Sequence, residues 1–142
     1  MLMQKGVSLV ADRMPKVIGP KTHAIIDHVV SISFVTMGVL FWRRGNKRAA
    51  VSSFICATAT GVNSTLTDYP GGIWKVMDFE THGKIDAGIA GLTTALPNLM
   101  YFNDDPEARF FHVQGIAETA VTALTDFRSG SNRAYQERQR AA

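Results

Sequence analysis

Histidine and aspartate recur together in two short phrases of this sequence. Thr-His-Ala-Ile-Ile-Asp occupies residues 22–27, and Thr-His-Gly-Lys-Ile-Asp occupies residues 81–86. A histidine and an aspartate four residues apart lie on one helix face, where they can pair with each other. The same two side chains could bind a divalent metal, and two such histidines could ligate a haem iron. No Glu-x-x-His pair or axial haem spacing accompanies them, so a purely structural role is the alternative.

A second phrase follows each of the first two. Leu-Thr-Asp-Tyr occupies residues 66–69, and Leu-Thr-Asp-Phe occupies residues 124–127. The first pair of phrases is offset by 59 positions and the second pair by 58. Two matches at nearly one offset predict a duplicated unit of about sixty residues.

Charge is distributed very unevenly along the 142 residues, although the mean hydropathy of +0.02 is that of a borderline soluble protein. Nearly all charged residues lie at the chain ends and in three connections, which leaves four apolar runs with few ionisable groups. A run of nineteen residues spans roughly 28 Å as a helix, close to the hydrocarbon core of a bilayer. The four runs are residues 24–42, 49–66, 87–102 and 110–124.

These runs predict an all-α, four-helix transmembrane bundle made of two tandem hairpin repeats. We expect five segments: an N-terminal cytoplasmic or interfacial segment with a short interfacial helix, the first hairpin, an interfacial connection, the second hairpin and a polar basic tail. Their bounds are residues 1–21, 22–69, 70–80, 81–127 and 128–142. A soluble four-helix bundle is the alternative, because the second and fourth runs are weakly apolar.

Two hairpins in the same orientation bring both helix starts and both helix ends to one side of the membrane. Thr22 and Thr81 are expected to cap the helices that they begin. A polar layer should form at that side, either as a clamp between the hairpins or as a ligand site. Its predicted members are His23, Asp27, Asp68, His82, Asp86 and Asp126.

The two tight turns should meet on the other side of the membrane. One turn is basic and the other acidic, so we expect an electrostatic latch between them. The residues concerned are Arg43, Arg44, Lys47 and Arg48 in the first turn and Asp104, Asp105 and Glu107 in the second.

Glu118 is a carboxyl in the middle of the fourth run. Such a group costs several kcal/mol in a membrane unless it is paired or protonated, so Glu118 is a functional candidate. The alternative is a neutral glutamate that bonds to Gln114, Asn63 or Thr60 in the bundle core.

Other function classes find little support. Cys56 is the only cysteine, so neither an intrachain disulfide nor a cysteine-cluster metal site can form. The basic residues flank helices without interleaved aromatic residues, so lipid headgroups suit the pI of about 9.2 better than nucleic acid does.

The chain resembles the SPW-repeat family of small bacterial membrane proteins over roughly residues 20–127. The resemblance rests on both His-x-x-x-Asp pairs, on Leu-Thr-Asp-Tyr at 66–69 with Gly72 and Lys75, on residues 97–102 (Pro-Asn-Leu-Met-Tyr-Phe) and on Glu118. Leu96-Pro97-Asn98 and Met37-Gly38-Val39 stand where that family has its name-giving tripeptide. The resemblance implies a repeat architecture in the bacterial inner membrane, and the excess of Lys and Arg on the terminal side predicts cytoplasmic termini.

From these observations the sequence predicts a structural or accessory membrane protein without catalytic machinery. It would face the lipid bilayer and associate with itself or with a larger membrane complex through small residues. One alternative is a module that binds haem, a metal or quinone at the His/Asp layer. A second alternative is a small proton-coupled carrier that uses Glu118.

Overall fold

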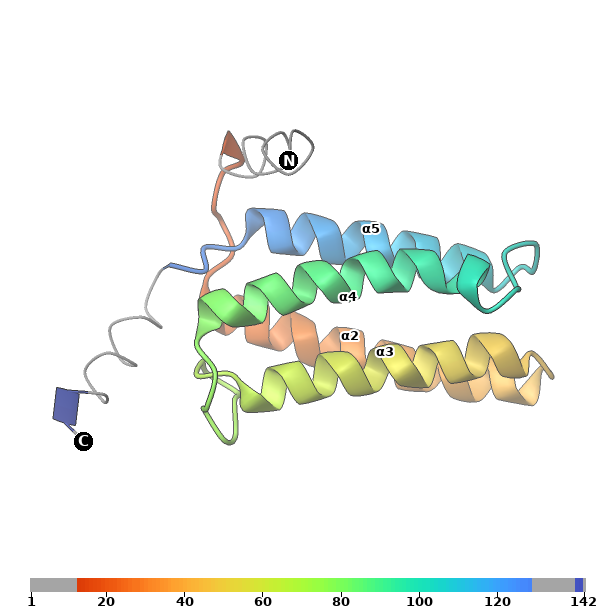
Figure 1. Cartoon of the computed structure of the whole chain (residues 1–142), viewed down its shortest axis with the longest axis horizontal. Helices are drawn as coiled ribbons and strands as arrows, with labels where there is room; N and C mark the ends of the chain where they lie inside the picture. The colour runs from red at the N-terminus through yellow and green to blue at the C-terminus, as the bar shows by residue number, and fades with distance from the viewer. Residues whose placement is uncertain (1–12, 129–139, 142) are drawn as a thin grey trace.

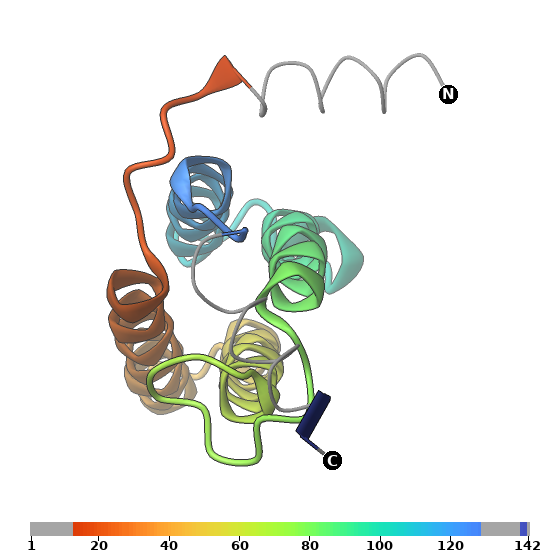
Figure 2. The same cartoon turned by 90° about the vertical axis from the view of Figure 1, so that its left-hand side faces the viewer.

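The computed structural model describes residues 13–128 and 140–141, and in these residues the chain is an all-α, four-helix bundle with hairpin pairing (Figures 1 and 2). This part of the predicted fold is confirmed. The predicted N-terminal interfacial helix and most of the basic tail lie outside the described residues. The helices are α2 (Pro20–Arg43), α3 (Lys47–Leu66), α4 (Phe79–Leu99) and α5 (Ala108–Leu124).

Helix α2 packs along α3, and α4 packs along α5 (Figure 1). Both tight turns lie at one end of the bundle, here called the turn end. The starts of α2 and α4 and the ends of α3 and α5 lie at the opposite end, here called the terminal end. The two pairs of sequence phrases therefore meet at the terminal end.

Local chemistry explains where the helices begin. Pro20 stands in the first turn of α2, where its missing N–H is not needed. The Asn46 side chain accepts a hydrogen bond from the Ala49 amide and caps α3, and Asp78 accepts one from the Thr81 amide and caps α4. The expectation that Thr22 and Thr81 cap their helices is wrong, because both helices begin two residues earlier than the sequence suggested.

The interior changes character along the bundle. Toward the turn end it is aromatic: Phe34, Phe41, Phe102 and Phe111 are almost fully buried, and Phe111 contacts the other three rings. Toward the terminal end the buried side chains are mostly polar. Among the described helices, α2 alone combines the length and the apolar composition of a membrane span.

The contact between the two turns differs from the predicted latch. The Asn46 side-chain amide donates to Asp105 Oδ2 at 2.8 Å and to Glu107 Oε2 at 3.1 Å. Arg48 instead donates to the Tyr101 carbonyl, and Lys47 lies over the Trp42 ring. No ion pair joins the two turns in the described residues, so a neutral amide makes the contact that we expected from charged side chains.

Two extended segments close the terminal end. The connection after α3 folds back on that helix, because the amides of Val76 and Met77 bond to the Leu66 carbonyl and the Asp68 amide bonds to the Met77 carbonyl. The segment before α2 pairs with the end of α5 through Ile18, whose amide bonds to the Leu124 carbonyl. These bonds hold the Leu-Thr-Asp phrases in place.

Replacement of Gly72 tests how closely the connection between α3 and α4 packs. A Cβ atom at this position would lie 1.7 Å from the Thr67 carbonyl oxygen, so Gly72→Ala must open the turn. We expect it to lower the free energy of unfolding by about 1–3 kcal/mol, measured by thermal unfolding followed by circular dichroism. Gly88→Ala in α4 is the control, since its Cβ would meet no atom within 4 Å and should stabilise the helix slightly. Equal unfolding midpoints for the two variants would contradict this packing.

Candidate metal centre

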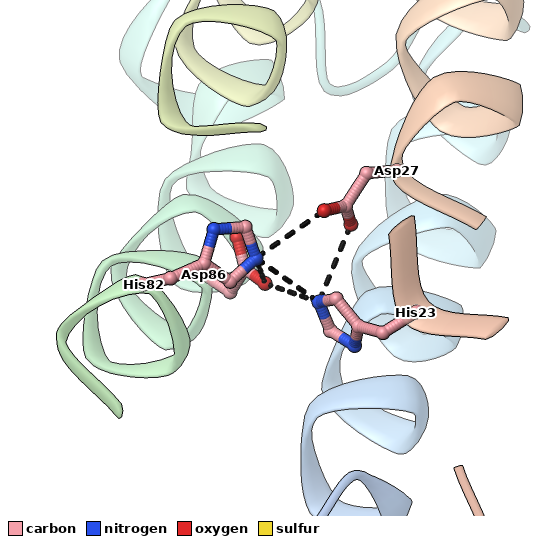
Figure 3. Close-up of side chains that lie close together, drawn as sticks. All are labelled: His23, Asp27, His82 and Asp86. Carbon is pink, nitrogen blue, oxygen red and sulfur yellow. Dashed lines mark hydrogen bonds and ion pairs between the residues drawn. The ribbon is translucent and has the colours of Figure 1, made fainter. Parts of the chain in front are cut away.

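Four side chains converge at the terminal end of the bundle: His23 and Asp27 from α2 and His82 and Asp86 from α4 (Figure 3). Both histidines are buried, and the side chains of Asp27 and Asp86 are only 7% and 12% exposed. One ligand atom from each residue lies within 4.8 Å of all the others. We call these residues the His/Asp cluster.

The nitrogen and oxygen atoms of the cluster point at one another. His23 Nε2 lies 3.1 Å from His82 Nε2, and Asp86 Oδ2 lies 2.9 Å and 2.8 Å from these two nitrogens. Asp27 completes the group, with Oδ1 3.4 Å from His23 Nε2 and Oδ2 3.2 Å from His82 Nε2. The cluster therefore has two imidazole nitrogens and two carboxylates around one point (Figure 3).

Two threonines orient the imidazole rings. Thr67 Oγ1 lies 2.8 Å from His82 Nδ1 and donates its own hydrogen to the Asn63 carbonyl at 2.6 Å. Thr125 Oγ1 lies 2.8 Å from His23 Nδ1 and donates to the Val121 carbonyl at 2.6 Å. A hydroxyl has one hydrogen, so each threonine must accept from the ring, and each Nδ1 carries the proton.

The carboxylates are held in the same way. The Tyr69 hydroxyl donates to Asp27 Oδ2 at 2.6 Å, and the Asn63 amide donates to Asp86 Oδ1 at 2.8 Å. The pKa of Tyr69 is raised above its ordinary value, first by burial and then by the negative charge of Asp27, so the phenol stays protonated and donates. Each member of the cluster thus has one partner outside it.

Either protons or a metal ion can satisfy this arrangement. With Nδ1 protonated, a neutral ring presents the bare lone pair of Nε2 to a carboxylate. If both Nε2 atoms also carry protons, His23 can donate to Asp86 Oδ2 at 2.9 Å and His82 to Asp27 Oδ2 at 3.2 Å. A single cation between the nitrogens and carboxylates would satisfy all four groups at once, because each would offer it a lone pair.

Two of the six residues predicted for the polar layer are not in the cluster. The side chain of Asp68 is buried and its Oδ1 lies 3.9 Å from Lys75 Nζ, while Asp126 Oδ1 accepts a hydrogen bond from the Arg128 amide. Sequence reasoning missed Thr67 and Thr125, which are the middle residues of the same Leu-Thr-Asp phrases. The repetition of the phrase could have indicated both threonines, but the charge of the neighbouring Asp68 and Asp126 favoured these aspartates as members of the polar layer.

Glu118 borders a cavity of about 90 Å³ beside the cluster, and His23, Asp27 and Asp86 line the same cavity. Neither carboxylate oxygen of Glu118 has a hydrogen-bond partner in the described residues, although Thr93 and Gln114 lie close by. Asn63 donates to Asp86 instead, and the Thr60 hydroxyl is also without a partner there.

Comparisons with protein-family models, with curated proteins and with solved structures found no match to this chain. The resemblance to the SPW-repeat family stays a prediction. The function must therefore be argued from the geometry of the cluster.

Thr125 provides a test of ring orientation. Thr125→Val leaves the Nδ1–H of His23 without its acceptor, and an unsatisfied buried group costs about 1–3 kcal/mol of unfolding free energy. Thr119→Val is the control, because Thr119 also donates to a carbonyl of its own helix but is exposed, and its replacement should change stability by less than about 0.5 kcal/mol. Thermal unfolding of both variants and of Thr125→Ser, which keeps the hydroxyl, measures the difference. Equal losses of unfolding free energy in the two valine variants would mean that the contact between Thr125 and His23 does not stabilise the fold.

Proposed function

We propose that this chain is a membrane-embedded metal-binding protein in which the His/Asp cluster holds one divalent transition-metal ion. The observation that carries the proposal is the orientation of the two histidines. Their Nδ1 atoms donate to threonines, so both Nε2 atoms, which remain available to bind a cation, point at the same two carboxylates.

The spacing of the cluster atoms supports a tetrahedral ion. Zinc lies about 2.0–2.2 Å from nitrogen and oxygen ligands, which places neighbouring ligands of a tetrahedron about 3.3–3.6 Å apart. The measured separations from Nε2 to Nε2 and from Nε2 to carboxylate oxygen run from 2.8 to 3.4 Å. Small outward movements of the side chains would therefore admit the ion. Two imidazoles and two carboxylates suit Zn²⁺, Fe²⁺ or Mn²⁺.

The outer partners also support a metal. Metal-binding histidines generally donate their second ring N–H to an oxygen, and metal-binding carboxylates accept further hydrogen bonds. All four residues of the cluster have such a partner, namely Thr125, Tyr69, Thr67 and Asn63. A cluster that only joined the two hairpins would not need an outer hydrogen-bond partner for each of its four residues.

Haem and quinone suit the cluster less well. The two Nε2 atoms lie 3.1 Å apart with carboxylates beside them, so a porphyrin plane has no room between them. The neighbouring cavity of about 90 Å³ is far below the roughly 300–1,000 Å³ of sites for larger ligands.

The distribution of polar and apolar side chains supports the membrane location. Ile32, Val113 and Ile116 are 65–70% exposed, whereas Ser52, Ser53 and Asn63 are buried. An apolar exterior over a polar interior is unfavourable in water and favourable in lipid. An apolar groove of about 720 Å³ between α3 and α4 would accommodate lipid chains. Both termini would lie in the cytoplasm of a bacterial cell, with the His/Asp cluster near that face.

Metal titration tests the proposed centre. Chelator-treated protein should bind one equivalent of Zn²⁺ or Co²⁺ by calorimetry, and His23→Ala or His82→Ala should abolish binding. Thr125→Val should weaken binding about 10–100-fold through loss of the outer partner. His28→Ala is the control, since His28 bonds to the Ala24 carbonyl of its own helix and should not affect binding. Folded wild-type protein that binds none of Zn²⁺, Fe²⁺ and Mn²⁺ would overturn the proposal in favour of a structural clamp.

Fractionation tests the membrane location. We expect the full chain to sediment with membranes and to stay there after alkaline carbonate washing, because its exposed apolar side chains would lie in lipid. Replacing exposed Val113 and Ile116 with lysine should reduce insertion, since a lysine at the centre of a helix costs about 2.5–3.5 kcal/mol. Asn103→Lys is a control, because Asn103 is exposed in the turn between α4 and α5. Recovery of the wild-type chain in the soluble fraction would support the soluble bundle instead.

A further inference from the structure

Two further polar side chains, Thr60 and Glu118, line the cavity beside the His/Asp cluster. Its wall contains His23, Asp27 and Asp86 from the cluster, together with Thr60 from α3 and Glu118 from α5. The rest of the wall is apolar apart from Thr122. The cavity therefore reaches three of the four proposed ligands.

Glu118 and Thr60 are unusual because their polar atoms are shielded from solvent yet unpartnered. Both oxygens of Glu118 and the hydroxyl oxygen of Thr60 lack a hydrogen-bond partner in the described residues. Leaving such groups unpaired is costly, so a ligand in the cavity that bonds to them is stabilised. A volume of about 90 Å³ admits water or a ligand of a few atoms.

We propose that this cavity gives the metal a fifth, exchangeable coordination position beyond its four protein ligands, occupied at rest by water that donates a hydrogen bond to Glu118. The proposal rests on the metal centre proposed above. Two aspartates balance the charge of a divalent ion, so the further ligand at rest is neutral. Glu118 then accepts from that ligand, and the Thr60 hydroxyl provides a second hydrogen-bonding group on the wall.

This arrangement selects a class of ligand. It favours small protic molecules that bind the metal through oxygen or nitrogen and present a hydrogen to Glu118. When Glu118 is ionised, its negative charge disfavours small anions at the same position. The cluster would thus act as a site for small ligands in addition to holding the ion.

Co²⁺-loaded protein allows a direct test, because the visible absorption of Co²⁺ reports its ligands. Azide is the probe, and calorimetry measures Co²⁺ binding separately. At alkaline pH, where Glu118 is ionised, we expect azide to change the spectrum of the wild type weakly, and to bind Glu118→Gln roughly tenfold more tightly because one negative charge is removed. Glu80→Gln is the control for charge, since Glu80 is exposed and pairs with Lys84, and its azide affinity should match the wild type.

The second part of the test uses a variant that fills the cavity. Ala117 lines the cavity, so Ala117→Leu should abolish the azide response while one Co²⁺ still binds. Ala120→Leu is the control, because Ala120 is on the same helix but does not line the cavity, and this variant should respond as the wild type does.

Normal Co²⁺ binding with no azide response in wild type and Glu118→Gln would overturn this inference and leave a closed metal site. An unchanged response in Ala117→Leu would place the open position elsewhere and overturn it too. Failure of the wild type to bind Co²⁺ would overturn the metal centre itself.

Discussion

The hydrogen bonds from two histidines to two threonines are the constraint on which the rest of this structure depends. Thr67 and Thr125 each give their only hydrogen to a carbonyl of their own helix, so each must accept the Nδ1–H of a ring. This leaves both Nε2 atoms facing Asp27 and Asp86. A pair of neutral hydroxyls thereby turns two buried imidazoles into candidate ligands.

The same bonds also join the two hairpins. Thr67 ends the first hairpin and holds His82 of the second, while Thr125 ends the second and holds His23 of the first. Each histidine is consequently fixed by the helix end of the other hairpin. The ring positions depend on how both hairpins close, and the extended segments at the terminal end maintain that closure.

The two ends of the bundle contribute differently. At the turn end, aromatic rings around Phe111 fill the interior, and Asn46 joins the two turns by hydrogen bonds to Asp105 and Glu107. At the terminal end, polar side chains replace them and leave a small cavity beside Glu118. Exposed apolar side chains such as Ile32, Val113 and Ile116 lie on the outside of the bundle, whereas the His/Asp cluster lies inside. This division lets one short chain combine a stable scaffold with a polar site.

The sequence by itself determined the four helices, their pairing as hairpins and the end at which the two phrases meet, because apolar runs and turn residues act locally. It also placed His23 with Asp27 and His82 with Asp86, since a spacing of four fixes a shared helix face. Only the tertiary structure decided that these two pairs form one cluster, that Thr67 and Thr125 join it and that Asp68 and Asp126 do not. Spacing along one helix says nothing about distances between hairpins, and the side-chain directions at helix ends follow from backbone bonds such as that of the Asp68 amide to Met77.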